Sequence, residues 1–269
     1  MIQKIRFAAY SLAALMTLSA CGGSTAAPTQ EDGAAEQNTA AEQTELTVFA
    51  AASLTESLTA IKETYETAHP EMELVFNFDS SGTLKTQIEE GADCDVFISA
   101  GQKQMNALEE LITADSRVDL LKNTVVLVAP KAAQNPPQDF TALNQVDSIA
   151  LGNSDVPVGQ YSQEILEYLG IWDKLNAGGK ITFGSNVKEV TAQVAAGAVD
   201  CGIVYRTDAA SEPDVVGTAE APADSYSPAI YPAAVLKDAP HPEEAQAFLD
   251  YLQTDDAMQA FSAVGFDRP

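Results

Sequence analysis

The chain has 269 residues, of which 39 are Asp or Glu and 14 are Lys or Arg, so its formal net charge at pH 7 is −25. Nucleic-acid binding requires a basic footprint that so acidic a chain does not offer, and we expect no nucleic acid as a partner. Anionic lipid head groups should also repel the chain, so any membrane attachment must come from an anchor. Net charge carries little information about the fold.

Residues 1–20 have the pattern of a secretory signal. Lys4 and Arg6 precede an apolar stretch from Phe7 to Leu18, which is too short to span a bilayer as a mature helix. The sequence Leu-Ser-Ala-Cys that ends at Cys21 resembles the lipobox of bacterial lipoproteins. This resemblance implies cleavage before Cys21, lipid on that residue, and a protein tethered to the extracytoplasmic side of the cell membrane. The alternative is an ordinary secreted protein with Cys21 near the cleavage point by chance.

Residues 21–44 are expected to form the lipidated cysteine and a flexible acidic linker. From residue 22 to residue 44 there is no aromatic residue, no branched aliphatic residue and no positive charge. Such a composition cannot bury enough apolar surface to fold, so it predicts a spacer between membrane and domain.

Strand-like and helix-like segments alternate through residues 45–269, as the spacing of apolar residues indicates. The expected strands are Leu46–Ala50, Glu73–Phe78, Val96–Ala100, Thr124–Ala129, Ser148–Gly152, Ile181–Phe183, Gly202–Tyr205 and Ile230–Leu236. The expected helices are Leu54–Tyr65, Thr83–Glu90, Gln102–Leu111, Tyr161–Leu169, Val187–Val194 and Pro242–Leu252.

This alternation predicts an α/β fold with mostly parallel sheets and helices on both faces of each sheet. Two such runs, joined around residues 120–147, predict a solute-binding domain of two lobes. We expect lobe 1 to comprise about 45–125 and 235–269, and lobe 2 about 126–234. Ligands of open α/β sheets bind beyond the carboxyl ends of the strands, which places the expected site in the cleft between the lobes.

Five segments that follow strands carry hydroxyls, small residues or helix starts. They are Ala50–Ser53, Asp79–Gly82, Val156–Gly159, Gly184–Asn186 and the strand end at Tyr205. Ser53 followed by Glu56 has the pattern of a capping box. Asn186 and Glu189 are also in capping positions, which predicts a helix that begins at Val187. Taken alone, Ser53 only caps its helix. Together the segments predict a cleft lined by hydroxyls and helix N-termini, which suits a fully deprotonated anion.

Cys94 and Cys201 each stand at the start of a predicted buried strand. The compartment allows a disulfide between them, but free cysteine commonly behaves as a small core residue. We therefore expect two separate buried thiols.

From about residue 46 to 267 the chain resembles the molybdate-binding proteins of ABC importers. The matching segments are Val48–Leu54, Phe78–Leu84, Asp95–Ala100 with Gln102 and Lys103, Val156–Tyr161, Gly202–Tyr205 and Val264–Phe266. The resemblance implies a type II periplasmic binding protein fold, capture of molybdate or tungstate, and delivery to a membrane permease driven by a separate ATPase subunit.

That family holds its oxyanion with hydroxyls and main-chain amides and without counter-cations. Carried over by motif, the donors are the hydroxyl and N–H of Ser53 and Ser81, the N–H of Val158 and Val187, and the phenol of Tyr205. The resemblance implies no direct metal ligands and no cofactor. Three positions depart from the family, of which Val158, in place of a frequent Ala, matters little because only its amide is carried over as a donor. Gly82 stands where relatives often have Ser, and Asp79 is unusual beside an anion site, where it either faces solvent or accepts a proton from a different ligand.

Other classes of function fit the sequence less well. The chain has no Gly-x-Ser-x-Gly elbow and no Walker-type loop, and His69 and His241 lack partners at metal-ligand spacing, so we expect no enzyme. A binding protein for sulfate, phosphate or iron remains the alternative. A lipoprotein that only binds a partner protein would need an exposed apolar patch. We expect the protein to be a monomer.

Overall fold

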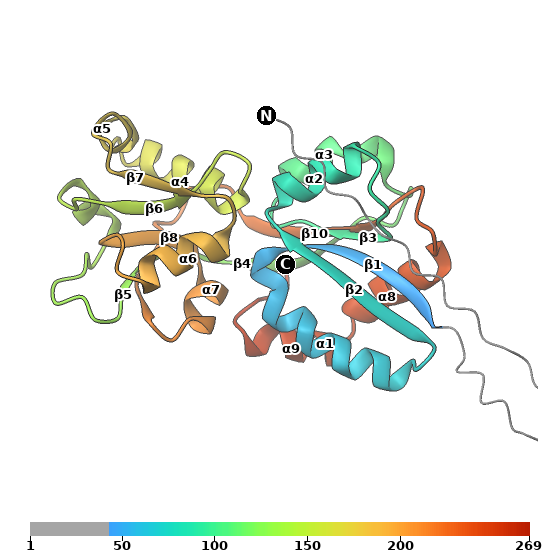
Figure 1. Ribbon diagram of the computed structural model, residues 1–269. Helices are drawn as coiled ribbons and strands as arrows, with labels where there is room; N and C mark the ends of the chain where they lie inside the picture. The colour runs from blue at the N-terminus through green and yellow to red at the C-terminus, as the bar shows by residue number, and fades with distance from the viewer. Residues whose placement is uncertain (1–42) are drawn as a thin grey trace, which may run out of the picture. The chain divides into compact units, whose positions relative to one another are not determined.

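In the computed structural model, residues 43–269 are described, and they form two five-stranded sheets with helices on both faces of each (Figure 1). The first sheet contains β1 (Thr44–Ala51), β2 (Met72–Asp79), β3 (Val96–Ile98), β4 (Val118–Asn123) and β10 (Ala229–Val235), in the order β2-β1-β3-β10-β4. The second sheet contains β5 (Val125–Pro130), β6 (Ile149–Gly152), β7 (Ile181–Gly184), β8 (Cys201–Tyr205) and β9 (Val215–Glu220), in the order β7-β6-β8-β5-β9. We call the layers around the first sheet lobe 1 and those around the second sheet lobe 2.

The helices divide between the faces of the two sheets. Those of lobe 1 are α1 (Thr55–Ala68), α2 (Ser81–Glu89), α3 (Gln102–Ala107), α8 (Pro242–Leu252) and α9 (Asp255–Ala263), with short 3-10 turns at Ala52–Leu54 and Glu109–Leu111. Those of lobe 2 are α4 (Pro157–Tyr168), α5 (Trp172–Ala177), α6 (Val187–Ala195) and α7 (Arg206–Ser211), with a 3-10 turn at Phe140–Asn144. In Figure 1, α2 and α3 lie on one side of the first sheet, and α1 and α9 lie on the other.

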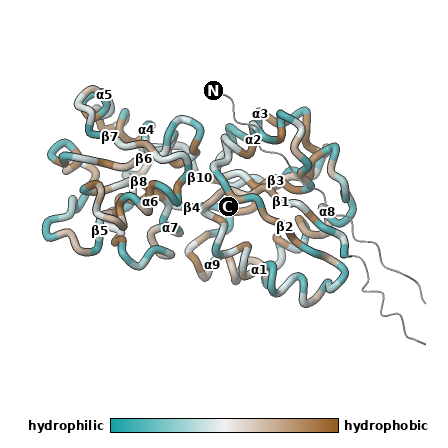
Figure 2. The backbone as a smooth tube through the Cα atoms, viewed as in Figure 1, coloured by the Kyte–Doolittle hydropathy of each residue, from teal (hydrophilic) through white to brown (hydrophobic). Residues whose placement is uncertain are grey.

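Strand β1 is buried on both faces because helices cover both. Val48 and Ala50 belong to one hydrophobic cluster, whereas Phe49 between them belongs to a second cluster with Leu84 and Phe97. Successive side chains of a strand point to opposite faces, so a central strand of such a sheet must be apolar throughout. Figure 2 shows the corresponding concentration of hydrophobic residues along the strands.

Each sheet has one strand that runs against the other four. β10 is antiparallel to β3 and β4, and β5 is antiparallel to β8 and β9, while β1, β2 and β3 pair in parallel, as do β6, β7 and β8. Both reversed strands are the first that the chain enters after crossing between lobes. The crossings are at Thr124, between β4 and β5, and at residues 221–228, between β9 and β10. The predicted fold class, two mostly parallel sheets flanked by helices, is confirmed.

Three details of the predicted organisation are wrong. The chain returns to lobe 1 before β10, not near residue 235, because β10 pairs with β3 and β4 of the first sheet. Thr44 opens β1 opposite Met72 and so does not belong to the linker. Strands β4 and β9 and helices α5, α7 and α9 were not among the expected elements.

The prediction of two separate thiols is confirmed, since Cys94 and Cys201 are both buried and free. Burial raises the pKa of each thiol to about 12, so neither is a ready nucleophile. The predicted signal and the lipidation of Cys21 lie outside the described residues.

Candidate functional site

A small cavity lies where the carboxyl ends of strands from both sheets meet the N-terminal ends of helices. Its lining consists of Ala51, Ala52, Ser53, Asp79, Ser80, Ser81, Ala100, Val156, Pro157, Val187 and Tyr205. The volume of this cavity is about 10 Å³. Pockets for drug-sized ligands run from about 300 to 1,000 Å³, so this cavity suits a ligand of only a few heavy atoms.

Four of the five predicted donors line this one cavity: Ser53, Ser81, Val187 and Tyr205. The fifth, Val158, is fully buried and follows Pro157, which does line the cavity. Segments from residue 53 to residue 205 are thus brought together as the sequence predicted. Their roles as ligand donors stay a prediction.

The hydroxyl of Ser81 is held so that its hydrogen is free. Ser81 opens α2 and is fully buried, and its Oγ accepts the backbone N–H of Ala100 at 2.9 Å. A serine hydroxyl that already accepts from an amide still has one hydrogen to donate. Because Ser81 lines the cavity, its hydroxyl can donate this hydrogen to an anion bound there.

The hydroxyl of Ser53 is oriented through a chain of side chains. The Asn123 side-chain oxygen accepts the N–H of Thr124 at 2.8 Å, which leaves its amide nitrogen as the group 3.2 Å from the Tyr231 hydroxyl. An amide nitrogen only donates, so the Tyr231 oxygen accepts and its O–H is available to Ser53 Oγ at 2.9 Å. When Tyr231 donates in this pair, Ser53 accepts and its own hydrogen is free for the cavity.

The predicted capping box at Ser53 and Glu56 is wrong. Ser53 lies inside the 3-10 turn before α1, and no side chain caps either that turn or α1. Its hydroxyl is instead committed to Tyr231, and Glu56 pairs with Lys188 of α6. Both partners are distant in sequence, and a local motif contains no information about them.

The phenol of Tyr205 reaches from lobe 2 to lobe 1. It is buried, and its hydroxyl donates to the backbone oxygen of Ala100 at 3.3 Å. Burial raises the pKa of Tyr205 well above its ordinary value of 10, so the phenol keeps its proton at physiological pH. The bond to Ala100 is long for an O–H donor, so an anion in the cavity would be a stronger acceptor for the same hydrogen.

Helix N-termini supply the remaining donors. Val158 is the second residue of α4 and Val187 is the first of α6, so neither N–H has an acceptor within its own helix. The predicted capping of α6 by Asn186 is confirmed, since its side chain accepts the N–H of Glu189 at 3.0 Å. The cap leaves the Val187 N–H available, and the helix dipole adds a partial positive charge.

Asp79 lines the cavity, and its carboxylate does not point freely into solvent. One of its oxygens accepts the N–H of Ser80 at 2.7 Å and the side-chain amide of Asn186 at 3.2 Å. The second contact crosses from lobe 1 to lobe 2. Two donors therefore offset the negative charge of Asp79 beside the predicted anion.

A backbone hydrogen bond also joins the lobes, at Gly82, which departs from the family pattern. The N–H of Gly82 in lobe 1 donates to the backbone oxygen of Asp155 in lobe 2 at 3.1 Å. A Cβ atom at Gly82 would lie 2.2 Å from that oxygen. The lobes approach this closely only because residue 82 has no side chain.

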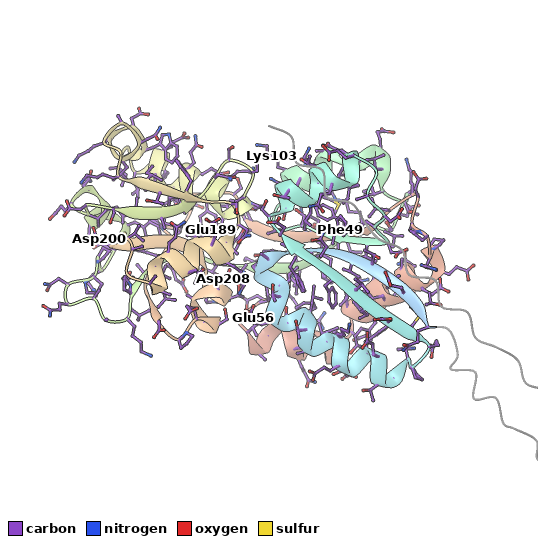
Figure 3. The ribbon with its side chains drawn as sticks, viewed as in Figure 1. Phe49, Glu56, Lys103, Glu189, Asp200 and Asp208 are labelled. Atoms are coloured by element: carbon purple, nitrogen blue, oxygen red, sulfur yellow. The ribbon has the colours of Figure 1, made fainter. Side chains whose placement is uncertain are left out.

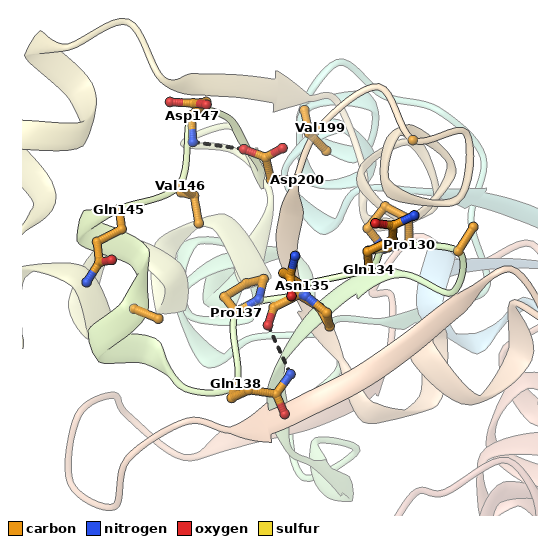
Figure 4. Close-up of a pocket in the computed structure, with 15 residues that line it drawn as sticks. Pro130, Gln134, Asn135, Pro137, Gln138, Gln145, Val146, Asp147, Val199 and Asp200 are labelled. Carbon is orange, nitrogen blue, oxygen red and sulfur yellow. Dashed lines mark hydrogen bonds between the residues drawn. The ribbon is translucent and has the colours of Figure 1, made fainter.

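No Lys, Arg or His is among the cavity's lining residues, and residues 43–269 contain no cluster of His, Cys, Asp and Glu suited to a metal ion. A larger pocket of about 750 Å³ lies elsewhere in lobe 2, around Pro130, Gln138, Asp147 and Asp200 (Figure 4). Its charged side chains are the carboxylates of Asp147 and Asp200, which would repel an anion. The smaller cavity is therefore the better candidate site.

Sequence reasoning missed Tyr231, Asn123 and the backbone of Ala100, all of which orient predicted donors. The strand containing Tyr231 was predicted, but nothing in its local sequence indicates a contact with Ser53. Sequence reasoning also missed the contact of Lys188 with Glu56. These residues are recognisable only once both lobes are folded.

Comparisons with known proteins agree with this geometry. Residues 46–267 match the family model described as bacterial extracellular solute-binding protein. The chain is 40% identical to YvgL of Bacillus subtilis, provisionally described as an ABC transporter substrate-binding lipoprotein, over 82% of this chain and 85% of that protein. It is 36% identical to the molybdate-binding protein ModA of Haemophilus influenzae, over 82% and 89%.

Among solved structures, the periplasmic molybdate-binding protein of Azotobacter vinelandii superposes with a TM-score of 0.75 at 25% identity, covering 83% of this chain and 99% of that one. These relatives are transport proteins, which agrees with the expectation that the chain is not an enzyme. With a family model that spans almost all of the folded residues, and with a donor-lined cavity between two lobes, the chain belongs to the bacterial extracellular solute-binding proteins.

Proposed function

We propose that the protein captures molybdate or tungstate outside the cytoplasm and delivers it to the permease subunit of an ABC importer. The relatives named as molybdate-binding proteins support the ligand class, and the family supports the role in transport. The oxyanion is cargo, and it would be bound through its oxygens with no protein ligand to the metal atom.

One observation carries this proposal. Ser81 accepts the backbone N–H of Ala100, so its hydroxyl hydrogen is left for the cavity, and the same holds for Ser53 when Tyr231 donates to it. A site built from such hydrogens, helix N-termini and a protonated phenol offers donors and few acceptors. It favours an anion that carries no proton, because a protonated oxygen would need an acceptor that the lining does not present.

Sulfate and phosphate are the main competitors. Phosphate carries a proton for part of the time at neutral pH, and Asp79 is the one carboxylate in the lining that could accept a hydrogen bond from it. That carboxylate already accepts from Ser80 and Asn186. Sulfate carries no proton, so donor chemistry does not discriminate against it, and the size of the closed cavity must do so.

Calorimetric titration with molybdate, tungstate, sulfate and phosphate tests the proposal. We expect tight binding of the first two anions and much weaker binding of the others. Tighter binding of sulfate or phosphate than of molybdate would contradict the ligand assignment and leave the family membership intact.

We further propose that the mature chain begins at a lipidated Cys21 and is tethered to the membrane by lipid alone. The Leu-Ser-Ala-Cys sequence and the relative described as a lipoprotein support this. Two or more acyl chains hold a protein stably on a membrane, whereas one holds it only marginally.

Mass spectrometry of the N-terminal peptide from membrane extracts should find the acylated cysteine. Cys21→Ser should release the protein without changing its affinity for oxyanions, and an unmodified Cys21 in those extracts would rule the anchor out.

A further inference from the structure

The N-terminus of α6 contacts lobe 1 on both sides of Val187. Before it, the side-chain amide of Asn186 donates to Asp79 of β2 at 3.2 Å. After it, Lys188 Nζ lies 2.7 and 2.8 Å from the two carboxylate oxygens of Glu56 on α1. The predicted amide donor is thus flanked by two contacts that exist only while the lobes are together.

Lys188 also has a partner within its own lobe. Its Nζ lies 3.3 Å from Asp208 of α7, whose carboxylate is fully buried. Within residues 43–269, neither oxygen of Asp208 has a hydrogen-bond partner. A buried carboxylate without hydrogen bonds is costly unless a cation lies beside it, so Asp208 keeps Lys188 in place whether or not the lobes touch.

Lys188 therefore contacts two carboxylates that belong to different lobes. Figure 3 labels both Glu56, which projects from α1 in lobe 1, and Asp208, which belongs to α7 in lobe 2. Burial by itself lowers the pKa of Lys188, but Asp208 and Glu56 together raise it above its ordinary value, so the amine stays charged. When the lobes part, Glu56 leaves and Asp208 remains.

We propose that Lys188 is a closure residue, which Asp208 holds ready in lobe 2 and which holds the cleft closed, with or without ligand, by binding Glu56 of lobe 1. The kinetic test of this inference rests on the proposed function, because it measures release of the oxyanion. Lys188 follows Val187 directly, so its contact with Glu56 holds the Val187 amide against the ligand. Lys188, Glu56 and Asp208 are positioning residues, since none of them lines the cavity.

This role predicts a kinetic effect rather than a loss of the site. The side chains of Lys188 and Glu56 are partly exposed, at 30% and 41%, so solvent and salt screen their attraction. Glu56→Gln should raise the dissociation rate of molybdate roughly two- to fivefold. High salt should raise the dissociation rate of the unaltered protein toward that of the variant.

Glu89→Gln is the matched control. Glu89 pairs with Lys85 at 2.6 Å on the surface of α2, entirely within lobe 1. Stopped-flow measurement of molybdate release from the two variants should give faster release for Glu56→Gln and no change for Glu89→Gln. Equal release rates in the two variants would overturn the closure role.

A second variant separates closure from stability. Lys188→Met alone should also destabilise lobe 2, because it leaves Asp208 buried without a cation. The double variant Lys188→Met with Asp208→Asn removes both charges, so it should fold normally and still release molybdate as fast as Glu56→Gln does. Release as slow as that of the unaltered protein would contradict the proposal.

Small-angle scattering without ligand distinguishes failure of this inference from failure of the proposed function. Glu56→Gln should increase the radius of gyration of the ligand-free protein relative to Glu89→Gln, whatever the cargo is. If no oxyanion binds, the proposed function fails and scattering still decides the closure role. Identical scattering of the two variants would then overturn it.

Discussion

The two lobes contribute different kinds of donor to the same cavity. Lobe 1 supplies the hydroxyls of Ser53 and Ser81, and each depends on a further group, Tyr231 or Ala100, to direct its hydrogen. Lobe 2 supplies the amides of Val158 and Val187, which their helices direct without help from any side chain. Hydroxyl donors can therefore be lost by changing a neighbour, whereas amide donors should tolerate changes of their own side chains.

The lobes also differ in the groups that stabilise a buried carboxylate. Asp95 of lobe 1 accepts the N–H groups of Thr47 and His241, each at 2.8 Å. Asp208 of lobe 2 is as buried but has no hydrogen-bond partner within the described residues. Backbone donors make the first carboxylate a fixed part of the fold, while the second depends on one movable cation, Lys188.

The largest expected effect concerns Asp208. Burial raises its pKa from 3.8 to about 6, with Lys188 opposing the shift only in part. A carboxyl whose pKa is raised on folding favours the folded state below the unfolded pKa, and this advantage is lost as pH rises through the folded pKa. The loss amounts to about 3 kcal/mol of unfolding free energy, between about pH 4 and pH 6.

Asp208→Asn should remove this pH dependence. Urea denaturation of both proteins at several pH values should give a difference in unfolding free energy that changes by about that amount, in favour of the variant at higher pH. Parallel stability curves for the two proteins would mean that Asp208 does not titrate in this range.

The hydroxyl donors of lobe 1 come next. Ser53→Ala and Ser81→Ala each remove one hydrogen bond to a charged ligand, which is worth about 1.5–3 kcal/mol. Each variant should weaken molybdate binding roughly ten- to a hundredfold, as measured by calorimetry. Unchanged affinity in both would refute the site assignment.

Gly82→Ala tests the closest approach of the two lobes. The added methyl group would meet the backbone oxygen of Asp155 at 2.2 Å only in the closed arrangement. Overpacking of this kind costs about 1–3 kcal/mol, so molybdate should bind about tenfold more weakly, with faster release.

Gly217→Ala is the matched control, because nothing lies within 4 Å of its Cβ position. Calorimetry should give that variant the affinity of the unaltered protein. If both glycine variants bind alike, lobe 2 can shift at residue 155 without loss of affinity.

Tyr231→Phe removes the hydroxyl that links Asn123 to Ser53 while leaving every predicted ligand donor in place. We expect roughly two- to tenfold weaker binding, because the Ser53 hydroxyl loses the partner that orients it. Tyr168→Phe is a control at an exposed tyrosine, 62% accessible, at the end of α4. Equal affinities for the two variants would show that Ser53 needs no orienting partner.

The smallest effect on binding is expected for Val158→Ala. The amide that would bind the ligand remains, so affinity should change by less than about twofold. The side chain is fully buried, however, and its truncation should lower the unfolding free energy by about 1–2 kcal/mol. A large loss of affinity without loss of stability would assign the side chain a role in the site.

Local sequence determined much of this protein. The apolar spacing predicted α1 and α6, the Asn186 cap fixed the start of α6, and the continuous apolar runs predicted β1 and β8, because these features depend on neighbouring residues alone. Edge strand β9 escaped prediction because much of it is exposed and it has no long apolar run. The motif positions likewise predicted four residues of one cavity, since strand ends in such folds converge.

Tertiary structure alone decided how those residues act. Ser53 looked like a helix cap, yet its hydroxyl bonds Tyr231, 178 positions away, and Glu56 bonds Lys188, 132 positions away. Gly82 departs from the family pattern. The structure explains this departure, because a side chain at residue 82 would overlap the backbone oxygen of Asp155 in the other lobe. Hydrogen-bond direction and closure depend on groups that meet only after both lobes have folded and come together, and no local pattern encodes such meetings.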